Sequence, residues 1–205
     1  MTPEHRHPRR RDRSKDETWI RALLHRGEAA VMAAVLDGQP VCLPRLYAYD
    51  EEREAVYVHG AYGGVTGKVL EKGASVEGAS EEDAGKEDAG EDGPGEKGAP
   101  VAMTVYEMGR LLPADEALEF GVEYRSVVLT GRAVEVDDPE EALRGLELIM
   151  AKYAPHLEAG EDYAPIQPEE LIRTSVVRID IESWSGKEKD APEDFPGAYR
   201  LEEVR

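Results

Sequence analysis

One long acidic, glycine-rich segment constrains the fold of this chain more than any other feature. Residues 73–99 hold seven glycines, nine Asp or Glu residues, and Val76 as the single bulky aliphatic residue. A Glu-Asp-Ala-Gly sequence occurs twice, starting at Glu82 and at Glu87, and this repetition is typical of low complexity. Such a composition buries too little apolar surface to offset chain entropy. We therefore expect residues 73–99 to be a disordered acidic insert.

The rest of the chain suits a single folded domain. Without the insert, 178 of the 205 residues remain. We expect a basic N-terminal arm over residues 1–15 and one domain over residues 16–205, interrupted by the insert. No apolar run approaches the roughly 20 residues of a membrane span, and the N-terminus lacks the apolar stretch of a secretory signal. These features predict a soluble, cytoplasmic protein with no membrane partner.

Charge and cysteine content exclude further classes of binding partner and site. The chain has 44 Asp and Glu residues against 25 Lys and Arg, and its net charge of -19 repels phosphate backbones, so we expect no nucleic-acid partner. The single cysteine, Cys42, cannot form an internal disulfide and has no companion at metal-ligand spacing. Because Cys42 lies between Val41 and Leu43, we expect it to be a small buried side chain rather than a nucleophile. No metal site is predicted.

Short segments with β-strand character account for most of the domain. Asp37 and Gly38 accept the positive φ angles of a tight hairpin turn between strands expected at 29–36 and 41–49. A third strand at 55–59 would continue this as an antiparallel meander. Three more strands are expected at 101–106, 126–136 and 174–181. Six short strands with two helices predict a mainly β, α+β fold, namely a small closed or split barrel with flanking helices.

Two helices are expected beside this barrel. Ser14 and Glu17 have the spacing of a capping box, in which Ser14 would cap a short helix that stops at Gly27. Asp138 followed by Pro139 is a strong helix start, and the apolar stripe that follows extends to residue 153. We expect this second helix to pack on the sheet.

Four stretches, in order and with matching spacing, carry a resemblance to a known family. They are Asp-Gly-Gln-Pro at 37–40 with Leu43 and Pro44, Tyr-Val-His-Gly-Ala at 57–61, Tyr-Arg-Ser-Val-Val at 124–128 with Gly131 and Ala133, and Ser-Gly-Lys at 185–187 with Pro192. Together they resemble the pyridoxamine 5'-phosphate oxidase-related flavin-binding proteins, in the branch that includes nitroimidazole-resistance-like proteins. The resemblance implies an FMN-binding split barrel that forms a homodimer, with each FMN in the groove between two subunits.

The resemblance also implies positions for the flavin ring and the substrate. The strand after the first hairpin would run along the isoalloxazine ring, which places Leu43, Pro44 and Arg45 near it. Arg45 would donate to the pyrimidine edge of the flavin or to its phosphate, the alternative being a solvated arginine on an edge strand. His59 would act near flavin and substrate as a hydrogen-bond donor or proton shuttle, the alternative being a structural imidazole at a strand end. Gly60 would allow close backbone approach.

Two further groups of residues are implied at the phosphate and across the dimer. Thr66 and Lys68 would contact the FMN phosphate, although Lys68 could equally be a surface lysine. The strand that begins with Tyr124, Arg125 and Ser126 would flank the phosphate and ring, with the Ser126 hydroxyl beside the Arg125 guanidinium. The alternative for Arg125 is an ion pair at the sheet end. Ser185 and Lys187 would approach the flavin of the partner subunit, the alternative for Lys187 being a plain surface lysine.

The implied function is that of an FMN-dependent oxidoreductase acting on a small molecule, possibly with NADH or NADPH as electron donor. Because the flavin supplies the redox chemistry, the protein needs no nucleophile of its own. A non-catalytic flavin- or haem-binding module and a deazaflavin-dependent reductase are alternatives on the same barrel. A cofactor-free structural protein, whose acidic insert recruits partners, is a further alternative from another class.

Overall fold

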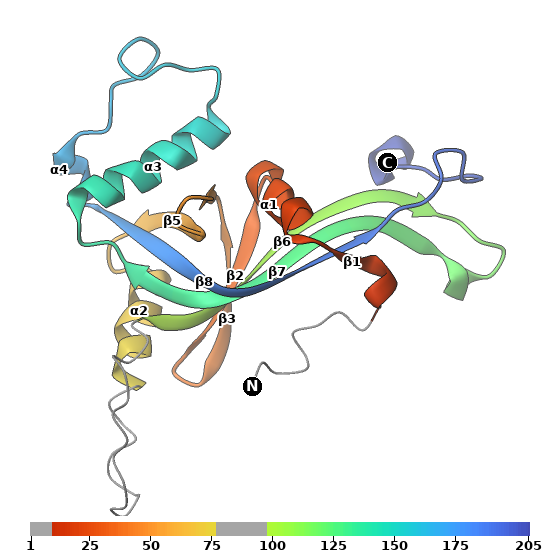
Figure 1. Cartoon of the computed structure of the whole chain (residues 1–205), viewed down its shortest axis with the longest axis horizontal. Coiled ribbons are helices and arrows are strands. Elements are labelled where there is room, and N and C mark those ends of the chain that lie inside the picture. Colours follow the sequence, from red (N-terminus) through yellow and green to blue (C-terminus); the bar gives the residue numbers. More distant parts are fainter. Residues whose placement is uncertain (1–9, 77–97) are drawn as a thin grey trace, which may run out of the picture.

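The computed structural model describes residues 10–76 and 98–205 (Figure 1). Residues 1–9 of the expected basic arm and residues 77–97 of the expected insert lie outside the described residues. The strands are β1 (Ser14–Lys15), β2 (Ala30–Leu36), β3 (Gln39–Arg45), β4 (Ala48–Asp50), β5 (Ala55–Ala61), β6 (Ala99–Leu112), β7 (Gly121–Glu135) and β8 (Thr174–Lys189). The α-helices are α1 (Glu17–Arg26), α2 (Val65–Val76), α3 (Pro139–Tyr153) and α4 (Pro168–Leu171).

All eight of these strands belong to one antiparallel sheet. Its order is β3-β2-β6-β7-β8-β5-β4, and β1 pairs with β8. The sheet does not close, because β3 and β4 stand at opposite ends of this order. The prediction of a mainly β split barrel with flanking helices is therefore confirmed. The second strand expected at 41–49 is divided into β3 and β4. The third strand, β5, pairs antiparallel with β4 as the meander predicts, but β4 does not continue the ladder of β3, and β5 also pairs with β8.

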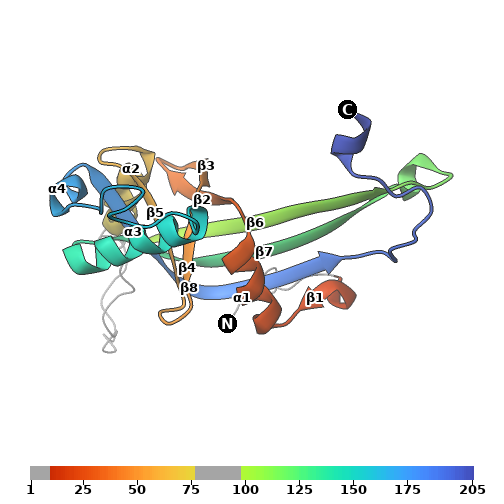
Figure 2. The same ribbon diagram turned by 90° about the horizontal axis from the view of Figure 1, so that it is seen from above.

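The three strands β6, β7 and β8 are longer than the sequence predicted, and they extend beyond the barrel. Pairing between β2 and β6 ends at Val105, while β6 continues to Leu112. Beyond this point β6, β7 and β8 continue together, and we call this extension of the sheet the arm, as distinct from the basic N-terminal residues. The C-terminal segment lies over the far end of the arm (Figure 2). The backbone of Leu111 exchanges hydrogen bonds with Tyr199, which ties that segment to the arm. Helices α2, α3 and α4 lie at the other end of the molecule.

Local sequence explains how several elements begin. Asp37 and Gly38 have φ angles of 53° and 72°, as predicted for the hairpin between β2 and β3. Asp138 caps α3 by accepting a hydrogen bond from the amide of Glu140, again as predicted. The predicted cap of α1 is wrong, because Ser14 belongs to β1. Asp16 performs that role, with its carboxylate accepting from the amide of Trp19 at 2.9 Å.

The hydrophobic core has two parts that meet at β5. Helices α1 and α2 close the barrel interior, where the largest fully buried side chains include Leu23, Leu24, Met32, Met103 and Val56. On the other side of β5, Tyr57 packs with Ala142 of α3 and Val176 of β8. Although β5 lies next to the end of the sheet, its residues Ala55–Val58 are therefore buried on both faces. Among the described helices, none is long and apolar enough to cross a membrane.

Two expectations about individual segments need correction. Cys42 is exposed instead of buried, because its neighbours Val41 and Leu43 turn toward the core and period-two alternation turns Cys42 outward. Helix α2 was not predicted, and its last turn includes residues 73–76, which we had assigned to the disordered insert. The start of the domain also differs, since β1 lies within the expected basic arm and pairs with β8.

Candidate functional site

Arg45 of β3 and Thr66 of α2 come together at one end of the barrel. His59, an exposed side chain near the end of β5, is close enough to Arg45 for the guanidinium charge to lower its pKa. The Arg45 guanidinium donates a hydrogen bond to the Thr66 hydroxyl, and Thr66 is only 7% exposed. The Nε atom of Arg45 is buried and has no hydrogen-bond partner among the described residues. No carboxylate of the described part of the chain forms an ion pair with Arg45. We call Arg45, His59 and Thr66 the barrel-end cluster.

The electrostatics of the barrel-end cluster favour an anion. Thr66 lies in the first turn of α2, where unpaired amides and the helix dipole create positive potential. The guanidinium of Arg45 adds its positive charge at the same place, and desolvation lowers the pKa of Arg45. Desolvation, followed by repulsion from Arg45, also lowers the pKa of His59, so the imidazole is neutral near pH 7. A buried donor without a partner beside this potential is suited to a phosphate oxygen.

Of the other residues expected at this end of the barrel, some lie on the same side as Arg45 and some do not. A Cβ atom at Gly60 would lie 3.6 Å from a terminal nitrogen of Arg45, so a larger side chain there would press on the guanidinium. Lys68 is exposed on α2, two residues beyond Thr66 and so on the other side of the helix. Leu43 packs against the core, whereas Pro44 is exposed on the opposite face of β3. The structure therefore brings Gly60, but not Pro44, to the same side as Arg45.

The remaining expected residues lie on the arm. Ser126 pairs with Lys187, and two residues away on each strand Val128 pairs with Ser185 and Tyr124 pairs with Lys189. Since side chains two residues apart share a face, Tyr124, Ser126, Ser185 and Lys187 all lie on one side of β7 and β8. We call this side of β6, β7 and β8 the open face.

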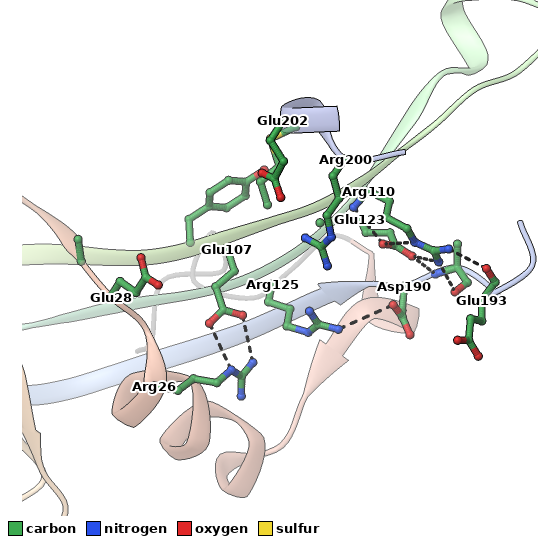
Figure 3. Close-up of a pocket in the computed structure, with 15 residues that line it drawn as sticks. Arg26, Glu28, Glu107, Arg110, Glu123, Arg125, Asp190, Glu193, Arg200 and Glu202 are labelled. Atoms are coloured by element: carbon green, nitrogen blue, oxygen red, sulfur yellow. Dashed lines mark hydrogen bonds and ion pairs between the residues drawn. The ribbon is translucent and has the colours of Figure 1, made fainter. Parts of the chain in front are cut away.

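Arg125 points to the opposite side of the arm. It donates to Glu188 at 2.7 Å and lies 3.8 Å from Asp190 (Figure 3). The expected pairing of the Arg125 guanidinium with the Ser126 hydroxyl is not found, because consecutive residues of a strand leave on opposite faces. The ion pair at the sheet end, which was the alternative reading of Arg125, is the arrangement observed.

The two groups of expected site residues are far apart within one chain. His59 pairs with Val176 near the start of β8, whereas Ser126 pairs with Lys187 near its end. Val176 and Lys187 are eleven steps apart along β8, which corresponds to roughly 36 Å of extended strand. A single protomer therefore does not bring both groups to one flavin.

A hollow of about 840 Å³ lies beside the arm, under the C-terminal segment (Figure 3). Most of its charged side chains are already paired: Arg26 with Glu107 at 3.2 Å, and Arg110 with Glu123 at 2.6 Å. Hydrogen bonds from Arg110 lower the pKa of Glu123 to about 2. The Arg26–Glu107 pair attaches α1 to the arm, and Arg110 attaches the C-terminal segment by donating to backbone carbonyls of residues 191–193. In the described part of the chain, no group of three or more metal-ligating side chains could hold a metal ion.

Sequence reasoning missed three residues that accompany Tyr124 and Lys187 on the open face. Tyr106 stacks on Tyr124, Lys189 pairs across from Tyr124, and Arg13 donates to the Tyr124 hydroxyl at 3.3 Å. Alternation within 106–108 and 187–189 could have placed Tyr106 and Lys189 if these strands had been predicted at full length. Nothing in the sequence indicated the contact of Arg13.

Several solved structures share this fold. The flavocytochrome Anf3 from Azotobacter vinelandii has a TM-score of 0.70 and 21% identity, covering 98% of this chain and 78% of its own. An FAD and heme binding protein from Mycobacterium smegmatis has a TM-score of 0.65 and 20% identity, covering 87% and 74%. A candidate 5-nitroimidazole antibiotic resistance protein from Bacteroides thetaiotaomicron has a TM-score of 0.60 and 15% identity, covering 84% of each chain. No curated protein matches the sequence significantly.

The open eight-stranded barrel with its extended arm thus defines a split-barrel protein of the type seen in these structures. Residues 91–188 match the family model described as pyridoxamine 5'-phosphate oxidase. The resemblance found in the sequence is thereby confirmed.

Proposed function

We propose that this protein binds a flavin, with FMN as the simplest candidate, and uses it for oxidation or reduction of a small molecule. The observation that carries the proposal is the barrel-end cluster, where the buried Nε of Arg45 lacks a partner among the described residues next to the start of α2. A phosphate there would accept from Arg45 and Thr66 and would balance the positive potential. The names of two structural relatives, a flavocytochrome and an FAD and heme binding protein, support a flavin as the ligand.

The residues of the barrel-end cluster would bind and orient the flavin. Arg45 and Thr66 would fix its phosphate, and the neutral His59 beside them could donate or accept one hydrogen bond without adding charge. When bound, the flavin supplies hydride or electron transfer, which requires no protein nucleophile. The remaining contacts to the ring would come from the edge of β3 and from a second subunit.

A second copy of the chain is part of this proposal. Ser126, Ser185 and Lys187 lie on the open face, too far along β8 to reach the barrel-end cluster of their own chain. Two copies that pack in opposite directions through their open faces would bring each arm toward the other copy's barrel-end cluster. The proposed homodimer therefore has two equivalent flavin sites, each built from both subunits.

The visible spectrum of the purified full-length protein tests the proposal directly. We expect flavin absorption bands, either as purified or after addition of FMN. A Soret band without flavin bands would favour the haem-binding alternative, and a colourless protein that does not bind FMN would overturn the proposal. Rapid mixing of the flavin-loaded protein with NADH or NADPH then separates an enzyme from a carrier. Bleaching of the flavin is expected for an oxidoreductase.

Paired arginine variants test where the phosphate binds. Arg45→Gln should weaken FMN binding by about 1.5–3 kcal/mol, which is the loss of one charge-assisted contact. Arg125→Gln removes a charge of the same sign from a residue already paired with Glu188, and should change FMN affinity by less than about twofold. Fluorescence titration of FMN gives both dissociation constants. A large loss with Arg125→Gln and none with Arg45→Gln would place the phosphate on the arm instead.

A further inference from the structure

The outer side of α3 carries apolar side chains that the core does not use. The inner side of this helix is buried, with Ala142 packing against Tyr57 of β5 and Val176 of β8. A second stripe at helical spacing lies on the other side and consists of Leu143, Glu147, Met150, Ala151 and Ala154. A helix that packs on a sheet with one side ordinarily presents polar residues on the other. The second stripe therefore indicates a surface with a role of its own.

The loop that joins α3 to α4 lies beside this stripe and encloses a hollow of about 500 Å³, on the side of α3 away from β8 (Figure 1). The loop contributes mostly apolar lining residues, among them Leu157, Tyr163 and Ile166. Its shape is held by its own backbone, because the amide of Gly160 donates to the carbonyl of Tyr163 at 2.7 Å and the amide of Leu157 to that of Ala154 at 3.1 Å. The hollow is therefore preformed. It lies at the opposite end of the molecule from the arm (Figure 2).

One charged side chain, that of Glu147, lines this hollow. Glu147 is exposed, and the two cations of the same helix are engaged elsewhere. Arg144 pairs with Asp50 at 2.9 Å, and Lys152 donates to the carbonyl of Leu24 at 3.2 Å. Among the described residues, the Glu147 carboxylate therefore has no cationic partner, although it stands in the middle of an apolar stripe.

The rim of the hollow adds negative charge. Residues 154–172 contain five Asp or Glu residues, one histidine, and no Lys or Arg. Two of these carboxylates accept from backbone amides, Asp162 from Glu158 and Glu170 from Gln167, both at 2.9 Å. None of the five forms an ion pair within the part of the chain that the structure describes. The rim therefore attracts cations and repels anions.

We propose that this hollow binds a small amphiphilic cation, an amine whose apolar body fills the hollow while its ammonium group meets Glu147. The ring of Tyr163 adds a surface for a cation–π contact with the same group. A neutral apolar molecule would leave the carboxylate without a partner, and an anion would be repelled. The combination of apolar lining and one free carboxylate thus selects this class of ligand.

The size and place of the hollow exclude larger occupants. A volume of about 500 Å³ suits a small molecule, since such sites measure roughly 300–1,000 Å³. An α-helix of a partner protein, about 10–12 Å across with its side chains, does not fit inside it. The proposed dimer packs through the open face and leaves this end of α3 uncovered. Binding of the amine therefore does not rest on the proposed flavin function.

Three probes with the same apolar body test the proposal: 4-phenylbutylamine, 4-phenylbutanol and 4-phenylbutyrate, which are cationic, neutral and anionic at pH 7. Each is titrated into full-length protein labelled with carbon-13 in its methionine methyl groups. Nuclear magnetic resonance follows Met150, which lines the hollow, and the exposed Met108 of the arm as reference. We expect the amine to shift Met150 but not Met108, and to bind about fivefold more tightly than the alcohol. The butyrate should bind more weakly still.

Variants on α3 separate charge from apolar contact. Glu147→Gln should weaken binding of the amine about fivefold and leave the alcohol unchanged, because it removes the charge and keeps the shape. Glu140→Gln is the matched control, since Glu140 is exposed on the same helix but lies outside the hollow, and it should change the amine affinity by less than about twofold. Ala151→Trp fills the hollow and should abolish binding of amine and alcohol alike. All three positions are exposed, and far-ultraviolet circular dichroism checks that the variants fold.

Several results would overturn the proposal. Equal affinity for the three probes, or wild-type affinity for the amine in Glu147→Gln, would remove the carboxylate from the site. A shift at Met108 with none at Met150, or no binding of the amine, would remove the hollow. Saturating FMN should leave binding of the amine unchanged. Displacement of the amine by FMN would show that the two share one site, and a separate site on α3 would then be wrong.

Discussion

At the scale of single residues, side-chain alternation decided which predicted contacts are possible. The family resemblance predicted that Arg45 and Thr66 both contact the flavin, and the structure joins their side chains by a hydrogen bond although they are 21 positions apart. It placed Arg125 and Ser126 together, which a strand of period two forbids. Cys42 was misjudged for the same reason, because a strand with one buried face exposes every second residue. These errors could have been avoided from sequence, whereas the unpaired Nε of Arg45 could only be found in three dimensions.

Glu123 offers a prediction at this scale. Its carboxylate accepts from the backbone amide of Arg110 at 3.0 Å, from the Arg110 guanidinium at 2.6 Å, and from the amide of Ala191 at 3.1 Å. Because the pKa of Glu123 is lowered from 4.5 to about 2, the stability it contributes is present above pH 4.5 and is lost as the pH falls toward 2. Glu123→Gln should lower the free energy of unfolding by roughly 2–3 kcal/mol at pH 7 and by much less near pH 2.5. Urea unfolding at both pH values measures this difference, and an equal loss at the two values would contradict it.

At the scale of elements, the sequence predicted where several helices and turns begin, but it did not predict how long the strands are. The turn at Asp37 and the start of α3 at Asp138 follow from local chemistry, and both are observed. The length of β6 was underestimated because residues 107–112 have no strong β preference, and their strand state comes from pairing with β7. Helix α2 was missed because Gly67 and Gly73 weaken the helical pattern, which tertiary packing of Val69 and Leu70 restores.

Gly131 supports a prediction about the junction of β7 and β8, where the pairing register shifts. A Cβ atom at Gly131 would lie 2.0 Å from the carbonyl oxygen of Asp180, so the strands would have to separate. We expect Gly131→Ala to lower the free energy of unfolding by about 3 kcal/mol in urea titration. Gly67→Ala is the matched control. No atom lies within 4 Å of its added methyl group, and alanine in a helix should stabilise by up to about 1 kcal/mol. Equal effects of the two substitutions would refute the close approach as the cause.

At the scale of the whole molecule, the open face connects the fold to the proposed function. Val31, Thr104 and Val128 form one row across β2, β6 and β7, and both valines are 42% exposed. An apolar row across the middle of a sheet is typical of a surface that another protein covers. The sequence predicted a dimer only through the family resemblance, because no pattern within one chain shows which sheet face lacks a covering helix.

The dimer itself gives the last prediction. Val128→Asp places a charge at the centre of the open face, and two copies facing each other would bury two such charges. We expect wild-type protein to have twice the 22.6 kDa mass of the chain by light scattering, and Val128→Asp to have the mass of one chain. The variant should also bind FMN at least tenfold more weakly, although its barrel-end cluster is unchanged, because half of each proposed site comes from the second copy. Ile172→Asp is the control, since Ile172 is 75% exposed but lies beside α4, away from the open face. A monomeric wild type that binds FMN at full affinity would show that one subunit suffices, and the proposed shared site would then be wrong.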